Sequence, residues 1–305
     1  MKQLLAIFLI IWAISVDADE FEIFAAGEFG QLAGTFHQID DDAPLLLIVP
    51  GSGPINRDGQ KPPALGLGVY HKMANEMAAR GISTLRIDKR GSYGSTGAIR
   101  NSDDLRIAGY ANDVRVWIDR IADNRCVWVL GHSEGGLVTT VAMRDSYAKV
   151  CGVILAASAG RGIDVILQEQ LTRYTRSKRI LRKIDNAVHA MKGGDMIDQD
   201  DIPITLRDLF SPVNQAYFID WMTYDPIAVV QNLMKPVLII QGDTDVRIKP
   251  KDARNLARAL PHATLRIFDG VNHVFQETDL TFPPSDMPLS PLVMDEIAHF
   301  ILSEG

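Results

Sequence analysis

Ser133 lies in the motif Gly-His-Ser-Glu-Gly at residues 131–135, directly after an apolar run and directly before a helical pattern. The small residues two positions before and after this serine allow a strand and a helix to approach closely at a sharp turn. Such a turn strains the serine backbone and exposes its hydroxyl at a helix N-terminus, where the helix dipole favours developing negative charge. The motif therefore predicts that Ser133 is a nucleophile.

A serine hydroxyl becomes a good nucleophile only when a nearby base takes its proton. Of the seven histidines, His273 is the one that directly follows the end of a late strand, in the loop of residues 269–273. The others fall in an edge hairpin, in helices, beside the serine, in a predicted insertion or at the opposite end of the sheet. His132 flanks Ser133 and should point away from it. We therefore predict that His273 is the general base.

The base needs an acid that holds its tautomer and stabilises the imidazolium. Two carboxylates, Asp243 and Asp245, follow the apolar run of residues 238–240. We assign Asp245 as the acid because it lies three residues after Gly242, and we expect Asp243 to shape the turn.

The oxyanion of a tetrahedral intermediate needs two backbone N–H donors. One should be the amide of Glu134, the residue after the nucleophile. The other should come from the loop of residues 50–54, Pro-Gly-Ser-Gly-Pro, where we expect Ser52 to donate and Gly53 to be the second choice. Gly51 and Gly53 permit close approach of the backbone to a substrate, so we expect both to contact it. A plain glycine turn is the alternative.

Short apolar runs that alternate with longer helical patterns must position these groups. Runs that are apolar at every position indicate strands buried on both faces, as in a parallel sheet. We predict a doubly wound, mostly parallel α/β sheet, with an antiparallel hairpin at one edge over residues 20–38. Strands are expected at residues 45–50, 82–88, 126–130, 150–157, 236–241 and 263–268, and helices at 70–80, 104–123, 134–148, 251–260 and 289–303.

Residues 160–230 interrupt this alternation, because they lack a clear buried strand and are rich in helix formers and charges. We predict a helical cap over the site here, inserted into a core of residues 19–159 and 231–305. The cluster of basic residues between 173 and 183 is interpreted as a solvated helix face rather than a binding patch.

The net charge of −7 over 305 residues disfavours nucleic acid and anionic membranes as partners. Residues 1–18 resemble a secretory signal peptide, with Lys2, an apolar run over residues 4–14, and small residues before a cleavage site after Ala18. The run is shorter than the ~20 residues of a membrane span, so we expect no stable span after cleavage. The predicted location is therefore secreted or periplasmic.

The two cysteines, Cys126 and Cys151, each open a predicted strand. If these strands are neighbours, the two thiols could form a disulfide in an exported protein. Two buried free thiols are the alternative. No histidine or cysteine has metal-ligand spacing with either residue, so we predict no metal and no cofactor.

These motifs jointly resemble those of the α/β-hydrolase esterases related to the serine aminopeptidase group, over roughly residues 20–303. The resemblance rests on the loop of residues 50–59, the stretches at 88–91, 131–136 and 241–245, the pair Asn272-His273, and Tyr-Asp-Pro at 224–226. Ser133, Asp245 and His273 also follow the chain order of that fold. One departure is visible, because Tyr93 occupies the position of a family glycine and Gly94 follows it.

The resemblance implies a Ser-His-Asp acyl hydrolase with a helical cap that acts on carboxylic esters without a metal. We expect a small-molecule ester with a small or medium acyl chain as substrate. An aminopeptidase-like enzyme, which would bind a free amine through the acidic residues 195–201, and an acyltransferase are the alternatives. A further alternative is a binding module on an inactive hydrolase fold. The oligomeric state is left open.

Overall fold

The computed structural model describes residues 19–60, 68–123, 125–144, 148–173, 175–280 and 284–304. The predicted signal peptide at residues 1–18 lies outside the described residues. Within these ranges, no helix is long and apolar enough to cross a membrane.

The centre of the molecule is an eight-stranded sheet with the order β1-β2-β4-β3-β5-β6-β7-β8. From β4 to β8 neighbouring strands are parallel, whereas β1 and β2 form an antiparallel hairpin that pairs with β4. The mostly parallel sheet and the edge hairpin are thus confirmed. The strands are β1 (Asp19–Ala26), β2 (Gln31–Gln38), β3 (Leu45–Val49), β4 (Ser83–Ile87), β5 (Val127–His132), β6 (Val150–Ala156), β7 (Val237–Gly242) and β8 (Thr264–Phe268).

Both faces of the central strands are buried, which explains their continuous apolar sequences. In β3, Leu45 and Leu47 belong to one core, whereas Leu46 and Ile48 belong to the other. Successive strand residues point to opposite faces, so each strand needs apolar side chains at every position.

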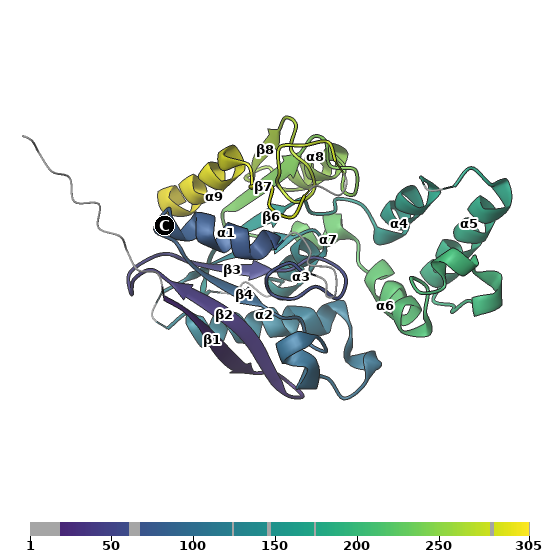
Figure 1. Ribbon diagram of the computed structural model, residues 1–305, viewed down its shortest axis with the longest axis horizontal. Helices are drawn as coiled ribbons and strands as arrows, with labels where there is room; N and C mark the ends of the chain where they lie inside the picture. Colours follow the sequence, from purple (N-terminus) through teal and green to yellow (C-terminus); the bar gives the residue numbers. More distant parts are fainter. Residues whose placement is uncertain are drawn as a thin grey trace, which may run out of the picture.

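Helices cover the two faces of the sheet in two layers (Figure 1). The residues of α1 and α9 pack in one core, and those of α2, α3, α7 and α8 pack in the other. The helix α3 is shorter than predicted, because the backbone leaves the helical region at Met143, with φ −89° and ψ 3°. These helices are α1 (Val69–Ala78), α2 (Ile107–Ile121), α3 (Glu134–Ala142), α7 (Pro226–Val230), α8 (Pro250–Ala259) and α9 (Pro291–Glu304).

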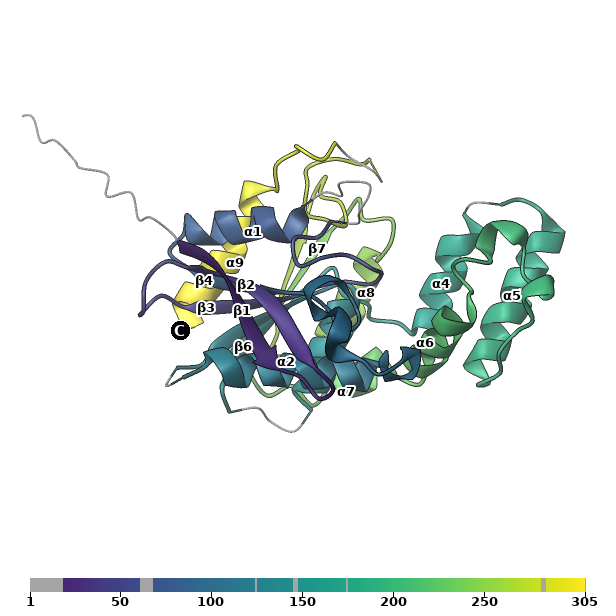
Figure 2. The same ribbon diagram turned by 60° about the horizontal axis from the view of Figure 1, so that its bottom comes forward.

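Three helices of the segment at residues 160–230 lie to one side of the sheet, apart from both layers (Figures 1 and 2). They are α4 (Ile163–Thr172), α5 (Lys178–Lys192) and α6 (Pro212–Met222). Their apolar faces form a small separate core that includes Leu167, Ile184 and Phe210. We call α4, α5 and α6 the cap helices. The carboxylate of Asp220 in α6 accepts a hydrogen bond of 2.8 Å from the amide of Ile107, which ties the cap helices to α2.

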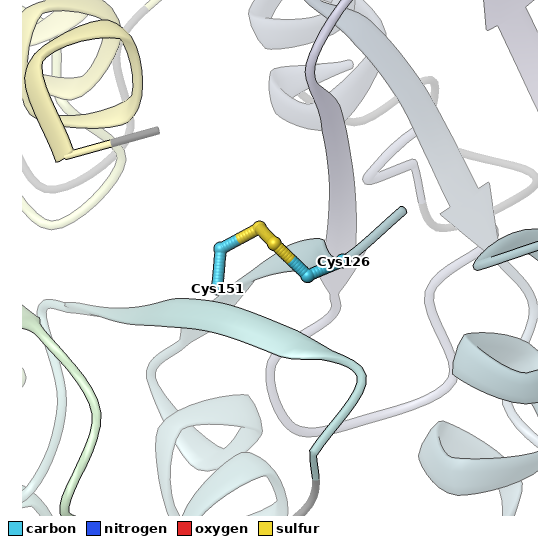
Figure 3. The surroundings of a disulfide bond; sticks show 2 residues. All are labelled: Cys126 and Cys151. Carbon is cyan, nitrogen blue, oxygen red and sulfur yellow. A yellow bond between two sulfur atoms is a disulfide. The ribbon is translucent and has the colours of Figure 1, made fainter. Parts of the chain in front are cut away.

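A disulfide joins Cys126 and Cys151 (Figure 3). Their strands β5 and β6 are neighbours, with Val127 paired to Val150, so the Cα atoms of the two cysteines are 5.1 Å apart. Of the two alternatives for these cysteines, the structure therefore has the disulfide.

Candidate active site

Ser133 occupies the turn between β5 and α3 with a left-handed backbone, φ 56° and ψ −117°. This conformation is strained for a residue with a side chain. A Cβ atom on Gly131 would collide with the carbonyl of Gly135, and one on Gly135 would collide with the carbonyl of Val49. The small residues of the motif are thus required by the close approach of α3 to the sheet, as the sequence pattern indicates.

The structure brings His273 and Asp245 together. The imidazole Nδ1 lies 2.7 Å from Oδ2 of Asp245, and both side chains are buried. Asp245 follows β7 and His273 lies in the loop after β8, so the carboxyl ends of two adjacent strands supply the pair. A hydrogen bond to Nδ1 leaves Nε2 as the nitrogen that can accept a proton from a nucleophile.

Asp245 is held as a carboxylate by several donors. Its Oδ1 accepts hydrogen bonds from the amides of Arg247 and Ile248, and its Oδ2 also accepts one from the side chain of Gln241. Burial alone would raise the pKa of Asp245, but His273 and these donors outweigh it, and the pKa is lowered. The nearby Asp243 instead accepts a hydrogen bond from the amide of Gly270, so it braces the turn.

Ser133 Oγ makes no hydrogen bond to His273 in the part of the chain that the structure describes. Such contacts are often long in hydrolases without substrate. The two residues are nevertheless linked through His132, whose Nε2 lies 3.0 Å from the carbonyl oxygen of His273. The rings of His132 and His273 are 4.9 Å apart.

A chain of hydrogen bonds crosses this region behind Ser133. The amide of Gly51 donates to the hydroxyl of Tyr70 over 2.7 Å, and this hydroxyl lies 2.9 Å from Nδ1 of His132. Because the His273 carbonyl only accepts, the proton of His132 lies on Nε2, and Tyr70 donates to Nδ1. Burial and then His273 lower the pKa of His132 to about 3, so the ring is neutral. We call this series of groups the Tyr70 chain.

The Tyr70 chain was not anticipated from the sequence. Tyr70 lies in α1 and Gly51 follows β3, so nothing in their spacing indicates that they meet. The expectation that His132 points away from Ser133 did not reveal what His132 would contact.

The loop of residues 50–54 lies against Ser133, since a Cβ atom on Gly51 would be 3.2 Å from that of Ser133. The amide of Gly51 is already bonded to Tyr70, which leaves Ser52 and Gly53 as candidate oxyanion donors in this loop. Ser52, Gly53, Ser133 and Glu134 all line one cavity, whereas Gly51 is buried beside it.

This cavity has a volume of about 780 Å³ and lies between the core and the cap helices. Its walls are largely apolar, with Leu167 and Leu171 from α4 and Phe218 and Trp221 from α6. A concave, largely apolar surface that also presents polar side chains is typical of a small-molecule site. We call it the substrate cavity.

Two buried charges lie at the base of the substrate cavity. Lys89 Nζ is 2.7 Å from Oε1 of Glu134 and 3.4 Å from the carbonyl oxygen of Gly51, and it lies over the ring of Tyr110. Burial would lower the pKa of Lys89, but the Glu134 carboxylate outweighs this and the pKa is raised. The ammonium group of Lys89 therefore remains charged and connects the loop of residues 50–54 to α3.

The loop after β4 contains the departure from the family pattern. Tyr93 has a φ of 45°, in the left-handed region that favours the glycine found there in the family. Its hydroxyl donates to the carbonyl of Pro54 over 2.8 Å. Asp88 and Arg90 are buried and pair with Arg57 and Asp113, so they brace the loops.

Comparisons with solved structures find the same fold in esterases. An esterase of Pyrococcus furiosus, Pf2001, is similar with a TM-score of 0.62 at 13% identity, covering 99% of this chain and 96% of that one. Est1E of Butyrivibrio proteoclasticus, solved with ferulic acid bound, has a TM-score of 0.60 at 16% identity and coverages of 92% and 98%. A thermophilic esterase of Thermogutta terrifontis, solved with malate bound, has a TM-score of 0.59 at 16% identity, covering 94% of this chain and 99% of that one.

At such low identity these likenesses demonstrate a shared fold, and the reaction must be argued from the site. No curated protein sequence matches this chain significantly. The model of the alpha/beta hydrolase family matches residues 46–281, which is well over half of the chain. The protein therefore belongs to the alpha/beta hydrolase family.

Proposed function

We propose that this hydrolase is a carboxylesterase that works through a Ser133–His273–Asp245 triad. Ser133 attacks the ester carbonyl while His273 takes its proton and then delivers it to the leaving alcohol. Asp245 holds the imidazole in the required tautomer and stabilises its charged form. The amides of Ser52 and Glu134 stabilise the oxyanion, and water then releases the acyl group.

The observation that carries this proposal is the buried pair of His273 and Asp245, at 2.7 Å, beside a strained serine that opens on the substrate cavity. The pair costs desolvation and the serine costs strain, and such costs are typical of functional sites. The volume and the apolar walls of the cavity favour small or medium acyl chains.

The aminopeptidase-like alternative is not supported by the residues that the sequence suggested for it. It requires an anionic site for a free amine, for which the acidic residues 195–201 were the candidates. None of these is among the residues that line the substrate cavity, and Asp200 pairs with Arg207 elsewhere on the cap.

Replacement of the nucleophile tests the proposal. We expect Ser133→Ala to lower the rate of p-nitrophenyl acetate hydrolysis at least about a hundredfold, because the covalent step is lost. Ser92→Ala is the matched control, since Ser92 also lines the cavity and has no role in the proposed mechanism. Residual activity above about a hundredth of the wild type would contradict the assignment. A fluorophosphonate probe that fails to label the wild type would instead favour an inactive binding module.

We also propose that the protein is exported and acts in the periplasm or outside the cell. The signal-like residues 1–18 support this, and so does the disulfide between Cys126 and Cys151, because disulfides persist in oxidising compartments.

A further inference from the structure

Two arginines that line the substrate cavity have no role in the proposed ester cleavage. They are Arg173, directly after the cap helix α4, and Arg247, in the loop after β7. Both side chains are also exposed to solvent. Within the described part of the chain, no carboxylate forms an ion pair with either guanidinium group. A guanidinium group that lines a ligand cavity without a counterion is suited to bind an anionic group of the ligand.

Arg247 is held close to the proposed catalytic groups. Its amide donates a hydrogen bond of 2.8 Å to Oδ1 of Asp245. Its carbonyl oxygen accepts one of 3.2 Å from the side chain of Gln170 in α4. Burial is the largest cause of the lowered pKa of His132, and the charge of Arg247 contributes to it as well. The backbone of Arg247 is therefore fixed, and its charge acts on the ring beside the proposed nucleophile.

Arg173 lies on the same wall of the cavity as Arg247. It follows Gln170 by three residues, and its backbone is still helical, with φ −69° and ψ −28°. Residues three apart lie on the same side of a helix. Because Gln170 contacts the carbonyl of Arg247, the two arginines lie on either side of this glutamine.

The carboxylate next to this wall is already bound by other cations. Glu169, which precedes Gln170 in α4, pairs with the following residues at 2.8, 2.9 and 2.8 Å: Arg161, Lys249 and Lys251. The proposed catalytic acid is likewise occupied by its imidazole partner and its amide donors. Neither carboxylate therefore serves as a counterion for the two arginines.

The charges that line the cavity favour a ligand with one negative charge. They are Lys89, Arg173 and Arg247 on the positive side and Glu134 and Asp208 on the negative side. Lys89 pairs with Glu134, whereas Asp208, just before α6, forms no ion pair with a described residue. The cavity thus has one more cation than anions, although the whole chain has a net charge of −7. Asp208 disfavours a dianion such as a phosphate monoester.

We propose that Arg173 and Arg247 form a subsite that binds a carboxylate group of the ester substrate. This inference rests on the proposed esterase function and names a substrate class for it, esters that carry a free carboxylate. A guanidinium group presents N–H donors in one plane, which match the two oxygens of a carboxylate. The ester carbonyl of such a substrate lies at Ser133, its chain contacts the apolar walls, and its carboxylate reaches the arginines.

Pairs of esters that differ by a carboxylate and a carboxamide test the subsite, because these groups have the same shape and differ in charge. In the acyl arm, mono-p-nitrophenyl adipate is compared with p-nitrophenyl adipamate. In the alcohol arm, 4-carboxyphenyl butyrate is compared with 4-carbamoylphenyl butyrate. Each kcat/KM is normalised to alkaline hydrolysis of the same ester. We expect the carboxylate to be preferred at least about tenfold in one arm, and the arm that responds locates the carboxylate on the substrate.

The variants Arg247→Gln and Arg173→Gln should each lower this preference, and the double variant should abolish it, because glutamine removes the charge and keeps the backbone contacts. Arg258→Gln is the matched control. It makes the same change in net charge at an exposed residue of α8 that does not line the cavity, so it should leave the preference unchanged. A ratio of two substrates on one preparation is unaffected by a partly unfolded variant.

A preference near one in both arms would overturn the subsite, as would a preference that the double variant retains. An equal loss of preference in Arg258→Gln would also overturn it, because overall charge would then select the substrate. Hydrolysis of the carboxamide esters that depends on Ser133 would still support the esterase function. Absence of all Ser133-dependent hydrolysis would contradict the function itself, so the two failures are distinguishable.

Discussion

Removal of one oxygen from Tyr70 should weaken both the fold and the active site. The hydroxyl of Tyr70 joins Gly51, in the loop of the proposed oxyanion donors, to His132, beside the proposed nucleophile. Burial raises the pKa of Tyr70, so the hydroxyl is protonated at any working pH and always donates to His132.

The size of the effect follows from the two groups that Tyr70→Phe would leave without a hydrogen-bond partner. The amide of Gly51 and Nδ1 of His132 are both buried, and Tyr70 itself is 1% exposed. An unsatisfied buried polar group costs about 1–3 kcal/mol, so two of them should lower the free energy of unfolding by about 2–6 kcal/mol. The released loop of residues 50–54 should also lower kcat for p-nitrophenyl acetate about tenfold, as a misplaced donor reduces oxyanion stabilisation.

Urea unfolding of the wild type and of Tyr70→Phe measures the first effect, and steady-state kinetics of the folded variant measure the second. Tyr224→Phe makes the same chemical change without breaking a hydrogen bond between described residues and should lower the free energy of unfolding by less than about 0.5 kcal/mol. If Tyr70→Phe lowers the free energy of unfolding no more than this control does, the argument is refuted. An unchanged kcat would show that the chain stabilises the fold without positioning the loop.

Two further predictions concern stability. The pKa of His132 is about 3 in the folded protein and 6.5 for the unperturbed side chain, so the unfolded chain binds the proton more tightly. Below about pH 6.5, this residue should therefore lower the free energy of unfolding by about 1.4 kcal/mol per pH unit. In urea titrations at several pH values, the unfolding free energy of His132→Gln should fall less steeply with decreasing pH than that of the wild type. Equal slopes for the two proteins would contradict the prediction. The disulfide closes a loop between cysteines 25 positions apart, so the double variant Cys126→Ala/Cys151→Ala should lose about 3.5 kcal/mol of unfolding free energy. Dithiothreitol should destabilise the wild type similarly but not the double variant, and free thiols detected in the denatured, unreduced wild type would argue against the bond.

Several parts of the fold and of the candidate site could be predicted because their signals are local. Continuous apolar runs located the central strands, since burial on both faces requires an apolar side chain at every position. The position of Ser133 followed from a five-residue motif whose glycines are needed by the turn itself. Asp245 and His273 could be selected because both follow the ends of parallel strands, and such ends share one edge of the sheet.

Other features depend on residues that meet only after the chain has folded. The predicted helix after Ser133 was too long, because the backbone already leaves the helical region at Met143, which the helical pattern does not reveal. The disulfide could not be chosen over free thiols until β5 and β6 were known to be neighbours.

The sequence by itself determined the class of fold and indicated the proposed nucleophile and its proposed partners, because these follow from short-range patterns of polarity and glycine. Only the tertiary structure decided what supports and surrounds them. Tyr70 contacts His132 from 62 residues away, and Lys89 contacts Glu134 from 45 residues away. A hydrogen bond requires a fit within tenths of an ångström, which packing establishes and residue spacing does not encode.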